Sequence, residues 1–159
     1  MDKLFEFEST ARSTESGADL GNLHMAGMSG GQRILIIDDD HGIADTLALI
    51  FSAHRYVARV AYSAEEAIEL IAQWPPRVAI IDVMLPHMNG IDLAIVLKSN
   101  YPSCRTLLFS GQPDTSRLVE EALKRGHKFE ILAKPLPPTF LLETVAGLLG
   151  ANHENSSDA

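Results

Sequence analysis

The fold is decided by the stretch Ile34-Leu35-Ile36-Ile37-Asp38-Asp39-Asp40, in which four apolar residues are followed directly by three carboxylates. A continuous apolar run of this kind is typical of a parallel strand that is covered on both faces of its sheet. Val78-Ala79-Ile80-Ile81-Asp82 repeats the pattern farther along the chain. We therefore expect two central strands, each of which ends at an acidic residue.

The rest of the region from residue 33 to residue 150 alternates short apolar runs with segments of helical period. We expect further strands at 57–61, 106–109 and 129–133, with a helix after each strand. Five strands that alternate with five helices predict an α/β chain with a parallel sheet and right-handed crossovers. The sequence does not set the strand order, but the flavodoxin-like order 2-1-3-4-5 is common for five such units.

Several residues mark the expected helix boundaries. Asp40 has the character of an N-cap, Ser63 and Glu66 form a capping box, and Asp114 or Thr115 precedes a further helix. The last helix is expected to follow Pro137-Pro138 and to stop at Gly150. This organisation predicts a flexible N-terminal extension over residues 1–32, one domain over 33–150 and a disordered C-terminal tail over 151–159.

Composition limits the classes of function. The chain has 159 residues, 46% of them hydrophobic, and a net charge of -8. An acidic chain without a basic stripe argues against direct binding of nucleic acid. Cys104 is the single cysteine, so no intramolecular disulfide can form, and a cytoplasmic location is compatible with that. We find no apolar run near the ~20 residues that span a bilayer and no signal peptide, so we expect no membrane insertion.

Polar side chains follow the expected strands at the same end. Asp38 and Asp39 follow the first strand, Asp82 the third, Ser110 the fourth and Lys134 the fifth. The carboxyl ends of parallel strands share one edge of a sheet, where ligands bind. Clustered carboxylates suit Mg²⁺, and a hydroxyl and an ammonium beside the metal suit the oxygens of a phosphoryl group. A carboxylate can itself be the nucleophile and form an aspartyl phosphate.

Each of these residues also has a purely structural interpretation. Asp40 is as readily a helix cap as a functional acid. Asp82 and Ser110 can be turn residues, and Lys134 can be a solvated strand end. Their joint occurrence favours a phosphoryl and metal site over these readings.

Four blocks of sequence resemble the CheY-like receiver domains of response regulators. They are the stretch 34–40, Ile80-Ile81-Asp82-Val83-Met84-Leu85-Pro86-His87-Met88-Asn89-Gly90, Phe109-Ser110-Gly111 and Ala133-Lys134-Pro135. The separations also agree, with 43 residues from Asp39 to Asp82, 28 from Asp82 to Ser110 and 24 from Ser110 to Lys134.

The resemblance implies a role for each position. Asp82 would be the phosphoacceptor. Asp39, Asp82 and the backbone carbonyl of Met84 would bind Mg²⁺ or Mn²⁺, with Asp38 contributing directly or through water. Ser110 and Lys134 would contact the phosphoryl group.

The resemblance also implies partners. A histidine kinase or a histidine phosphotransfer protein would donate the phosphoryl group, and the domain would be consumed stoichiometrically rather than act as an enzyme. Residues 114–149, which hold the fourth helix, the fifth strand and the fifth helix, would form the surface that switches. We see no effector domain, so we expect output through a protein target or a homodimer.

One position departs from the family pattern. Receivers usually carry Tyr or Phe three residues before the lysine, and here that residue is Ile131. Phe129 lies two residues earlier and, by strand alternation, on the same face. The departure leaves open a second function, a receiver-fold scaffold that binds proteins with impaired switching. A third alternative is a metal-dependent phosphohydrolase with an Asp nucleophile.

Two histidines lie close to the expected site in the sequence. His41 follows the acidic triplet, and we interpret it as a surface residue at the start of a helix. His87 lies in the loop after Asp82, where it could tune the access of water or of a partner to an acyl phosphate.

Overall fold

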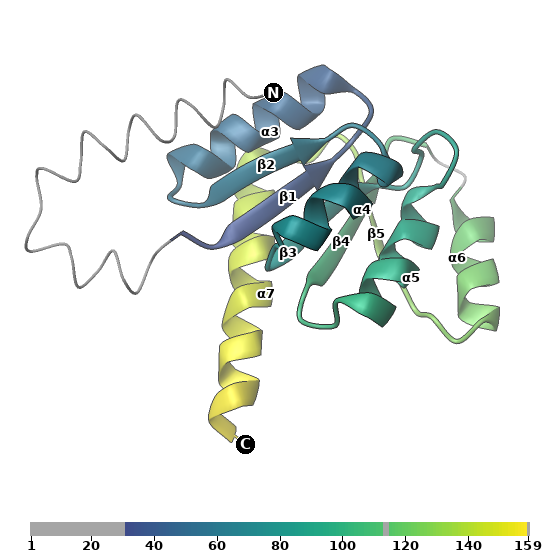
Figure 1. The fold of residues 1–159 in the computed structure, drawn as a ribbon. Coiled ribbons are helices and arrows are strands. Elements are labelled where there is room, and N and C mark those ends of the chain that lie inside the picture. Colours follow the sequence, from purple (N-terminus) through teal and green to yellow (C-terminus); the bar gives the residue numbers. More distant parts are fainter. Residues whose placement is uncertain (1–30, 113–114, 159) are drawn as a thin grey trace, which may run out of the picture.

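The chain folds into a parallel sheet between two layers of helices, in a computed structural model that describes residues 31–112 and 115–158 (Figure 1). Side chains are described as far as residue 150. The five strands lie in the order β2-β1-β3-β4-β5, which confirms the predicted order and the flavodoxin-like α/β class. The strands are β1 Arg33–Ile37, β2 Val57–Ala61, β3 Val78–Asp82, β4 Arg105–Ser110 and β5 Ile131–Ala133.

Helices cover both faces of the sheet. Their bounds are α3 His41–Ala53, α4 Ala64–Gln73, α5 Gly90–Asn100, α6 Ser116–Lys124 and α7 Pro138–Asp158. The core cluster on one face takes its helical residues from α4, α5 and α6, and the cluster on the other face takes them from α3 and α7. This doubly covered sheet is the architecture that the alternation of strands and helices predicts.

The two central strands explain the uninterrupted apolar runs. Every residue from Ile34 to Ile37 and from Val78 to Ile81 is fully buried. Alternate side chains point to opposite faces of a strand, and accordingly Leu35 and Ile37 join one core cluster while Ile34 and Ile36 join the other. Both faces need apolar residues, so no polar residue interrupts the run before the strand ends.

The predicted helix caps are confirmed in part. The Asp40 carboxylate accepts the Ile43 N–H at 3.1 Å, and Ser63 Oγ accepts the Glu66 N–H at 3.1 Å. The capping box is incomplete, because Glu66 Oε1 lies 3.5 Å from the backbone nitrogen of Tyr62 instead of that of Ser63. The glutamate thus reaches one residue farther back than the motif predicts.

Two other boundaries differ from the prediction. Thr115 precedes α6 without a side-chain capping hydrogen bond, while the alternative cap Asp114 lies outside the described residues. β5 begins at Ile131 instead of 129, because only Ile131, Leu132 and Ala133 pair with β4. Phe129 therefore precedes the strand.

The C-terminal helix is longer than predicted. We expected a stop at Gly150 and a disordered tail over 151–159, but the backbone of α7 continues to Asp158. Glycine ends a helix when its φ is positive, and Gly150 has no such φ. Within a helix a glycine costs only about 1 kcal/mol relative to alanine. The predicted extension over residues 1–32 lies almost wholly outside the described residues.

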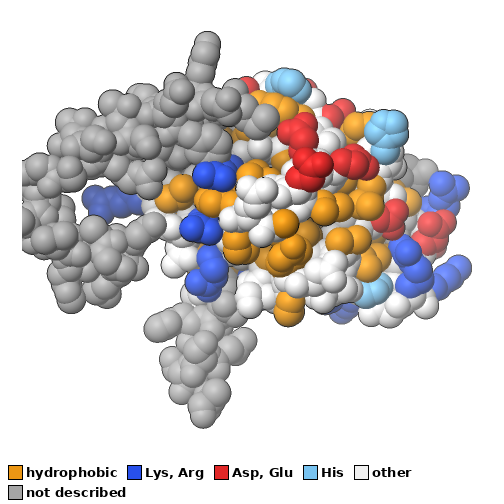
Figure 2. All heavy atoms as spheres, viewed as in Figure 1, with side chains coloured by type: hydrophobic (Ala, Val, Ile, Leu, Met, Phe, Trp, Pro, Cys, Tyr) orange, Lys and Arg blue, Asp and Glu red, His pale blue; other side chains and the backbone are white. Residues whose placement is uncertain are grey.

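The face drawn in Figure 2 carries charge of both signs, with Asp and Glu side chains gathered between two groups of Lys and Arg side chains. α4 lies on this side of the sheet and contributes exposed Glu65, Glu66 and Glu69. The Lys and Arg side chains on this face form separate groups and not one continuous basic band. None of the helices described is both long and apolar enough to cross a membrane.

Candidate functional site

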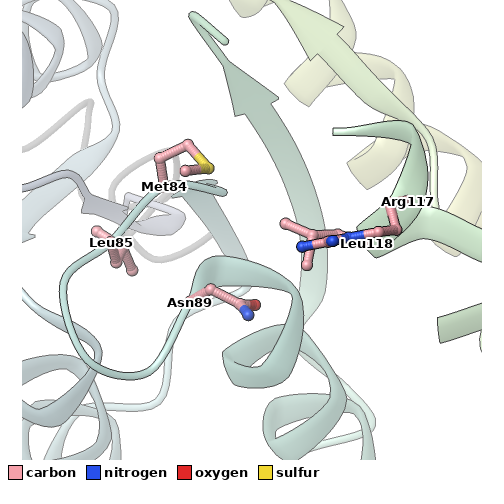
Figure 3. A pocket seen from close by; sticks show the side chains of 5 residues that line it. All are labelled: Met84, Leu85, Asn89, Arg117 and Leu118. Atoms are coloured by element: carbon pink, nitrogen blue, oxygen red, sulfur yellow. The ribbon is translucent and has the colours of Figure 1, made fainter. Parts of the chain in front are cut away.

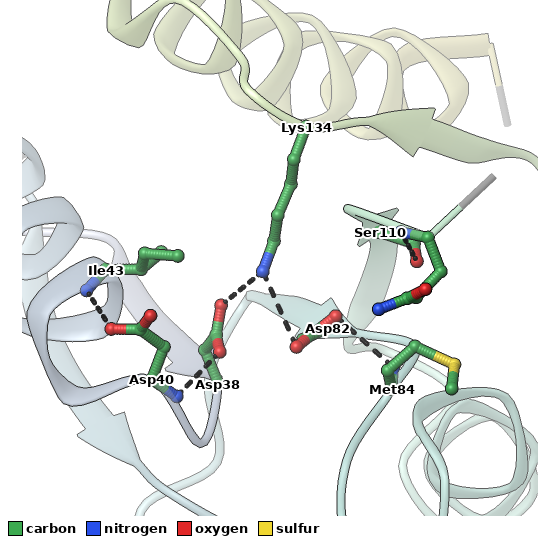
Figure 4. Close-up of polar contacts among 8 residues, drawn as sticks. Asp38, Asp40, Ile43, Asp82, Met84, Ser110 and Lys134 are labelled. Atoms are coloured by element: carbon green, nitrogen blue, oxygen red, sulfur yellow. Dashed lines mark hydrogen bonds and ion pairs between the residues drawn. The ribbon is translucent and has the colours of Figure 1, made fainter.

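Four polar side chains meet at the carboxyl edge of the sheet (Figure 4). Asp38 follows β1, Asp82 ends β3, Ser110 ends β4 and Lys134 follows β5. These four strands are successive neighbours in the sheet, so Asp38 and Lys134 touch although 96 positions separate them in the sequence. The structure thus brings together the residues that the strand ends predicted.

Three carboxylates form the acidic part of the site. One oxygen from each of Asp38, Asp39 and Asp82 lies within 4.8 Å of the others. Asp38 is fully buried, Asp82 is 5% exposed and Asp39 is exposed. Lys134 brings one positive charge against three negative ones, and the donors are hard oxygen atoms. A divalent cation such as Mg²⁺ or Mn²⁺ therefore fits this cluster.

The environment of Asp82 favours its protonated form. Burial and the charge of Asp38 raise the pKa of Asp82 from 3.8 to about 6, although Lys134 and the Met84 N–H act in the opposite direction. The Met84 N–H donates to Asp82 Oδ1 at 3.2 Å. A carboxylate under this electrostatic strain gains by binding a cation, which offsets the repulsion from Asp38.

Lys134 bridges two of the acids. Its ammonium donates to Asp38 Oδ2 at 2.8 Å and lies 3.5 Å from Asp82 Oδ2. Burial alone would lower the pKa of Lys134, but the hydrogen bond to Asp38 and the charges of both acids outweigh burial and raise it. The peptide bond from Lys134 to Pro135 is cis.

The acidic triplet divides into three roles. Asp38 has both oxygens engaged, because Oδ1 accepts the Asp40 N–H at 2.9 Å and Oδ2 accepts from Lys134. Asp40 caps α3, which confirms the structural interpretation of that residue. Asp39 points its exposed carboxylate toward the cluster without a hydrogen-bond partner among the described residues. Asp39 is thus the carboxylate of this triplet that is most open to direct contact with a metal.

Ser110 is held in a turn beside the acids. It is 3% exposed, and its Oγ accepts the Gln112 N–H at 3.1 Å. The hydroxyl hydrogen is a donor in addition, so Ser110 can still donate to a phosphoryl oxygen. A rotation of the Ser110 side chain toward a phosphoryl group would weaken its hydrogen bond with Gln112.

Gly90 fixes the loop that follows Asp82. Its N–H donates to the Val83 carbonyl at 2.8 Å. A Cβ at this position would lie 2.2 Å from the Asp82 carbonyl oxygen, so only glycine lets the start of α5 approach β3 this closely. His87 in the same loop is exposed, with a φ of 64°. Its proposed effect on access to an acyl phosphate stays a prediction.

Sequence reasoning missed an aromatic pair at the rim of the site. The His41 ring stacks on the Tyr62 ring with a centroid distance of 3.6 Å. The Tyr62 hydroxyl donates to Asp45 Oδ1 at 2.6 Å, and burial and that contact raise the pKa of Tyr62 to about 12. The signal was Tyr62 itself, an aromatic residue directly after the end of β2. His41 does begin α3 and is exposed, as expected.

Two apolar residues, Ile131 and Phe129, lie near the position of the missing aromatic. Ile131 is half-buried and pairs with Leu108 of β4. The Phe129 ring lies 6.3 Å from the His127 ring, with Lys98 Nζ of α5 5.7 Å from its centroid. These contacts direct Phe129 toward α5, and they give it no direct link to the acidic site.

A pocket of about 390 Å³ lies beside the acidic cluster (Figure 3). It is lined by Met84 and Leu85 from the loop after β3, by Asn89, and by Arg117 and Leu118 from α6. Met84 belongs to both features, since its N–H contacts Asp82 while its side chain borders the pocket. Any occupant of the pocket would thus lie next to the acceptor loop.

The fold and the site together define a class of protein: a flavodoxin-like α/β domain with a cluster of carboxylates, a hydroxyl and a lysine at the carboxyl edge of its sheet. Residues 34–146 match the response regulator receiver domain, and the chain belongs to this family. Receiver domains are signalling domains. The match confirms the resemblance drawn from the four sequence blocks.

Known relatives agree with this assignment. The chain is 28% identical to the DNA-binding response regulator MtrA of Mycobacterium tuberculosis, over 80% of this chain and 54% of that protein. It is 30% identical to the response regulator MprA of Mycobacterium ulcerans, over 74% of this chain and 50% of that protein. The chain therefore spans about half the length of these relatives.

Solved structures show the same fold. A CheY-like response regulator receiver domain protein from Methanospirillum hungatei superposes with a TM-score of 0.71 at 27% identity, covering 79% of this chain and 98% of that one. The receiver domain of an HD domain-containing protein from Pseudomonas fluorescens gives a TM-score of 0.70 at 28% identity, with 78% and 98% coverage.

Proposed function

We propose that this chain acts as the receiver of a response regulator in a two-component or phosphorelay system, with Asp82 as its phosphoacceptor. The observation that carries the proposal is the position of Asp82, buried beside two further carboxylates and 3.5 Å from the Lys134 ammonium. The donor would be a histidine kinase or a histidine phosphotransfer protein, in the cytoplasm.

Mg²⁺ or Mn²⁺ would be held by the carboxylates of Asp39 and Asp82 and by the Met84 carbonyl. Asp38, whose two oxygens accept from the Asp40 N–H and from Lys134, would contribute directly or through water. Bound there, the metal would neutralise negative charge shared by the acceptor and the phosphoryl group.

The transfer is a displacement at phosphorus. An Asp82 carboxylate oxygen forms a bond to phosphorus while the bond to the donor's histidine nitrogen breaks, and the electron pair stays on that nitrogen. Lys134 would pair with a phosphoryl oxygen and Ser110 would donate a hydrogen bond to another. The product is an acyl phosphate on Asp82, so each domain is consumed once and the domain is not an enzyme in this step.

The output would come from the surface of α6, β5 and α7. Leu123 of α6 and Phe140 of α7 are 56% and 43% exposed, and exposed apolar side chains of this size suit a protein partner or a second copy of the chain. The DNA-binding activity named for MtrA is not carried over, because the match covers 54% of that protein and the family match on this chain is the receiver domain. We propose output through protein contacts.

The test is incubation with Mg²⁺ and acetyl phosphate, read by intact mass and by mobility on a Phos-tag gel. The parent protein should be modified once and Asp82→Asn should not be modified. Asp40→Asn is the matched control, since it removes a charge at the same rim and retains the cap, and it should be modified like the parent. An unmodified parent, or an Asp82→Asn variant modified equally, would overturn the proposal.

A receiver-fold scaffold with impaired switching is the second candidate, favoured by Ile131 and by the direction of Phe129 toward α5. Backbone amide spectra distinguish the two candidates. A scaffold would be phosphorylated without shifts in β5 and α7, whereas a switch would show them. Multiple turnover on a generic phosphate ester would instead indicate the phosphohydrolase alternative.

A further inference from the structure

Phe109 lies between the lysine and the acceptor. β4 separates β5 from β3 in the sheet, and Phe109 is in register with Asp82 on one side and with Leu132 on the other. Residues in register point to the same face of a sheet. The Lys134 side chain, which starts after β5, must therefore cross β4 at Phe109 to reach Asp82 and Asp38.

The contacts of Lys134 agree with this path. Its Nζ lies 4.6 Å from the centroid of the Phe109 ring. On the other side its stem passes Gly111, where an added Cβ would meet Lys134 Cδ at 3.6 Å. The ammonium thus has an aromatic ring beside it and two carboxylates ahead of it.

We propose that Phe109 is the positioning residue of the site: its ring holds the Lys134 ammonium in line with the phosphoryl position next to Asp82. The proposal rests on the proposed function for its role in transfer. An aromatic ring presents negative charge on its face, and the attraction to an ammonium is strongest where water is excluded. Phe109 is 2% exposed, so almost no solvent reaches its ring.

The Phe109 ring also connects Lys134 to the layer of α3 and α7 on one face of the sheet. Phe109 belongs to the core cluster that contains Leu141 and Val145 of α7, with Leu132 of β5 packed against it. A movement of Lys134 toward a phosphoryl group would therefore change what the Phe109 face contacts.

The experiment compares Phe109→Leu with Phe51→Leu in the full chain. Phe51 lies in the same core cluster and is fully buried, so the two variants make the same chemical change in the same core. With acetyl phosphate at saturating Mg²⁺, Phe109→Leu should be phosphorylated about fivefold more slowly, while its Mg²⁺ affinity stays within about twofold of the parent. Phe51→Leu should keep the parent rate.

Two further variants complete the experiment. Phe109→Tyr retains the ring and should be phosphorylated at the parent rate. Phe109→Met replaces Phe109→Leu in the comparison if Phe109→Leu does not fold.

A second readout does not depend on phosphorylation. Protons above a ring face shift upfield, so the Hε signals of Lys134, assigned with Lys134→Arg, should lie upfield in the parent and in Phe51→Leu and should move downfield in Phe109→Leu. A parent-like rate in a folded Phe109→Leu or Phe109→Met variant, or an unshifted Lys134 signal in the parent, would overturn the proposal. A parent that shows the shifted signal but takes no phosphoryl group would overturn the proposed function and leave the placement of Lys134 by Phe109 standing.

Discussion

Lys134 is bonded to Asp38 and not primarily to Asp82: its ammonium lies 2.8 Å from Asp38 Oδ2 and 3.5 Å from Asp82 Oδ2. Asp38 is fully buried, and a buried carboxylate without a partner is strongly disfavoured. The lysine therefore also has a structural role, as the partner of Asp38. It would have to exchange partners when the acceptor carries a phosphoryl group.

Replacing Lys134 should consequently affect stability as well as phosphorylation. We expect Lys134→Met to lower the free energy of unfolding without metal by about 2 kcal/mol, because Asp38 loses its cation inside the fold. Urea unfolding followed by circular dichroism measures this. Lys98→Met is the control, since Lys98 is exposed, and its loss should stay within about 0.5 kcal/mol. Equal stability of the two variants would contradict the structural role.

Asp82 should make the metal-free domain less stable as pH rises. Its pKa in the folded state, about 6, exceeds the ordinary value of 3.8. As pH rises, the unfolded state therefore loses this proton at a lower pH than the native state does. The unfolding free energy should then fall between about pH 4 and pH 6, by about 2 kcal/mol. The Asp82→Asn variant should lack this fall and be more stable than the parent at pH 7.

The control for this pH dependence is Asp92→Asn, which removes a surface carboxylate that lies 3.2 Å from Arg125. The fall between about pH 4 and pH 6 should remain in this variant. Saturating Mg²⁺ should reduce the advantage of Asp82→Asn, because the metal stabilises only the parent site. If the unfolding free energy of the parent does not change from about pH 4 to pH 6, the raised pKa of Asp82 does not control the stability of the domain.

The sequence predicted the fold because burial on both faces leaves a direct signature. Ile34 to Ile37 must all be apolar in a doubly covered strand, and the polar residue that follows marks the end of the strand. Parallel topology then places Asp38, Asp82 and Lys134 at one edge. The acidic site thus follows from local patterns and one rule of sheet geometry.

Contacts between elements that no local pattern encodes could not be predicted. Phe109 is another apolar strand residue in the sequence, and only its register with Asp82 gives it a place under Lys134. The stack of His41 on Tyr62 depends on how α3 and β2 end beside each other. The continuation of α7 past Gly150 was missed because glycine is an ambiguous signal, permitted within a helix and favoured after one.

Asp39 should affect the metal without affecting the fold. It is exposed, so Asp39→Asn should change the unfolding free energy by less than about 0.5 kcal/mol. Loss of one carboxylate ligand should weaken Mg²⁺ binding by about tenfold or more in isothermal titration calorimetry. Asp40→Asn should bind Mg²⁺ like the parent, because Asn is an equally good N-cap. If Asp39→Asn and Asp40→Asn lose Mg²⁺ affinity to the same extent, the loss of one negative charge near the site explains the result, and Asp39 is not a ligand.

Ser110 should report phosphorylation through Gln112. Its Oγ accepts the Gln112 N–H at 3.1 Å, and a hydroxyl that turns to a phosphoryl oxygen weakens that bond. The Gln112 amide signal of the parent should shift on addition of acetyl phosphate and Mg²⁺, and this shift should be absent in Ser110→Ala. Ser63→Ala removes a helix cap at a comparable cost of about 1 kcal/mol and should retain the shift. A Gln112 signal that responds equally in both variants would show that Ser110 does not move.

Gly90 should tolerate no side chain, because its backbone is packed against the acceptor strand. A Cβ would lie 2.2 Å from the carbonyl oxygen of Asp82 and 2.8 Å from the Val83 Cα, and these are backbone atoms that cannot rotate away. We expect Gly90→Ala to lower the free energy of unfolding by about 3 kcal/mol and to weaken Mg²⁺ binding, since the loop that carries Met84 must shift. The control is Gly147→Ala in α7, where a Cβ meets nothing within 4 Å. Alanine there should raise stability by up to about 1 kcal/mol, so opposite signs for the two substitutions are the expected result in urea unfolding. A Gly90→Ala protein with parental stability and Mg²⁺ affinity would mean that α5 can move away from β3 without disturbing the acceptor.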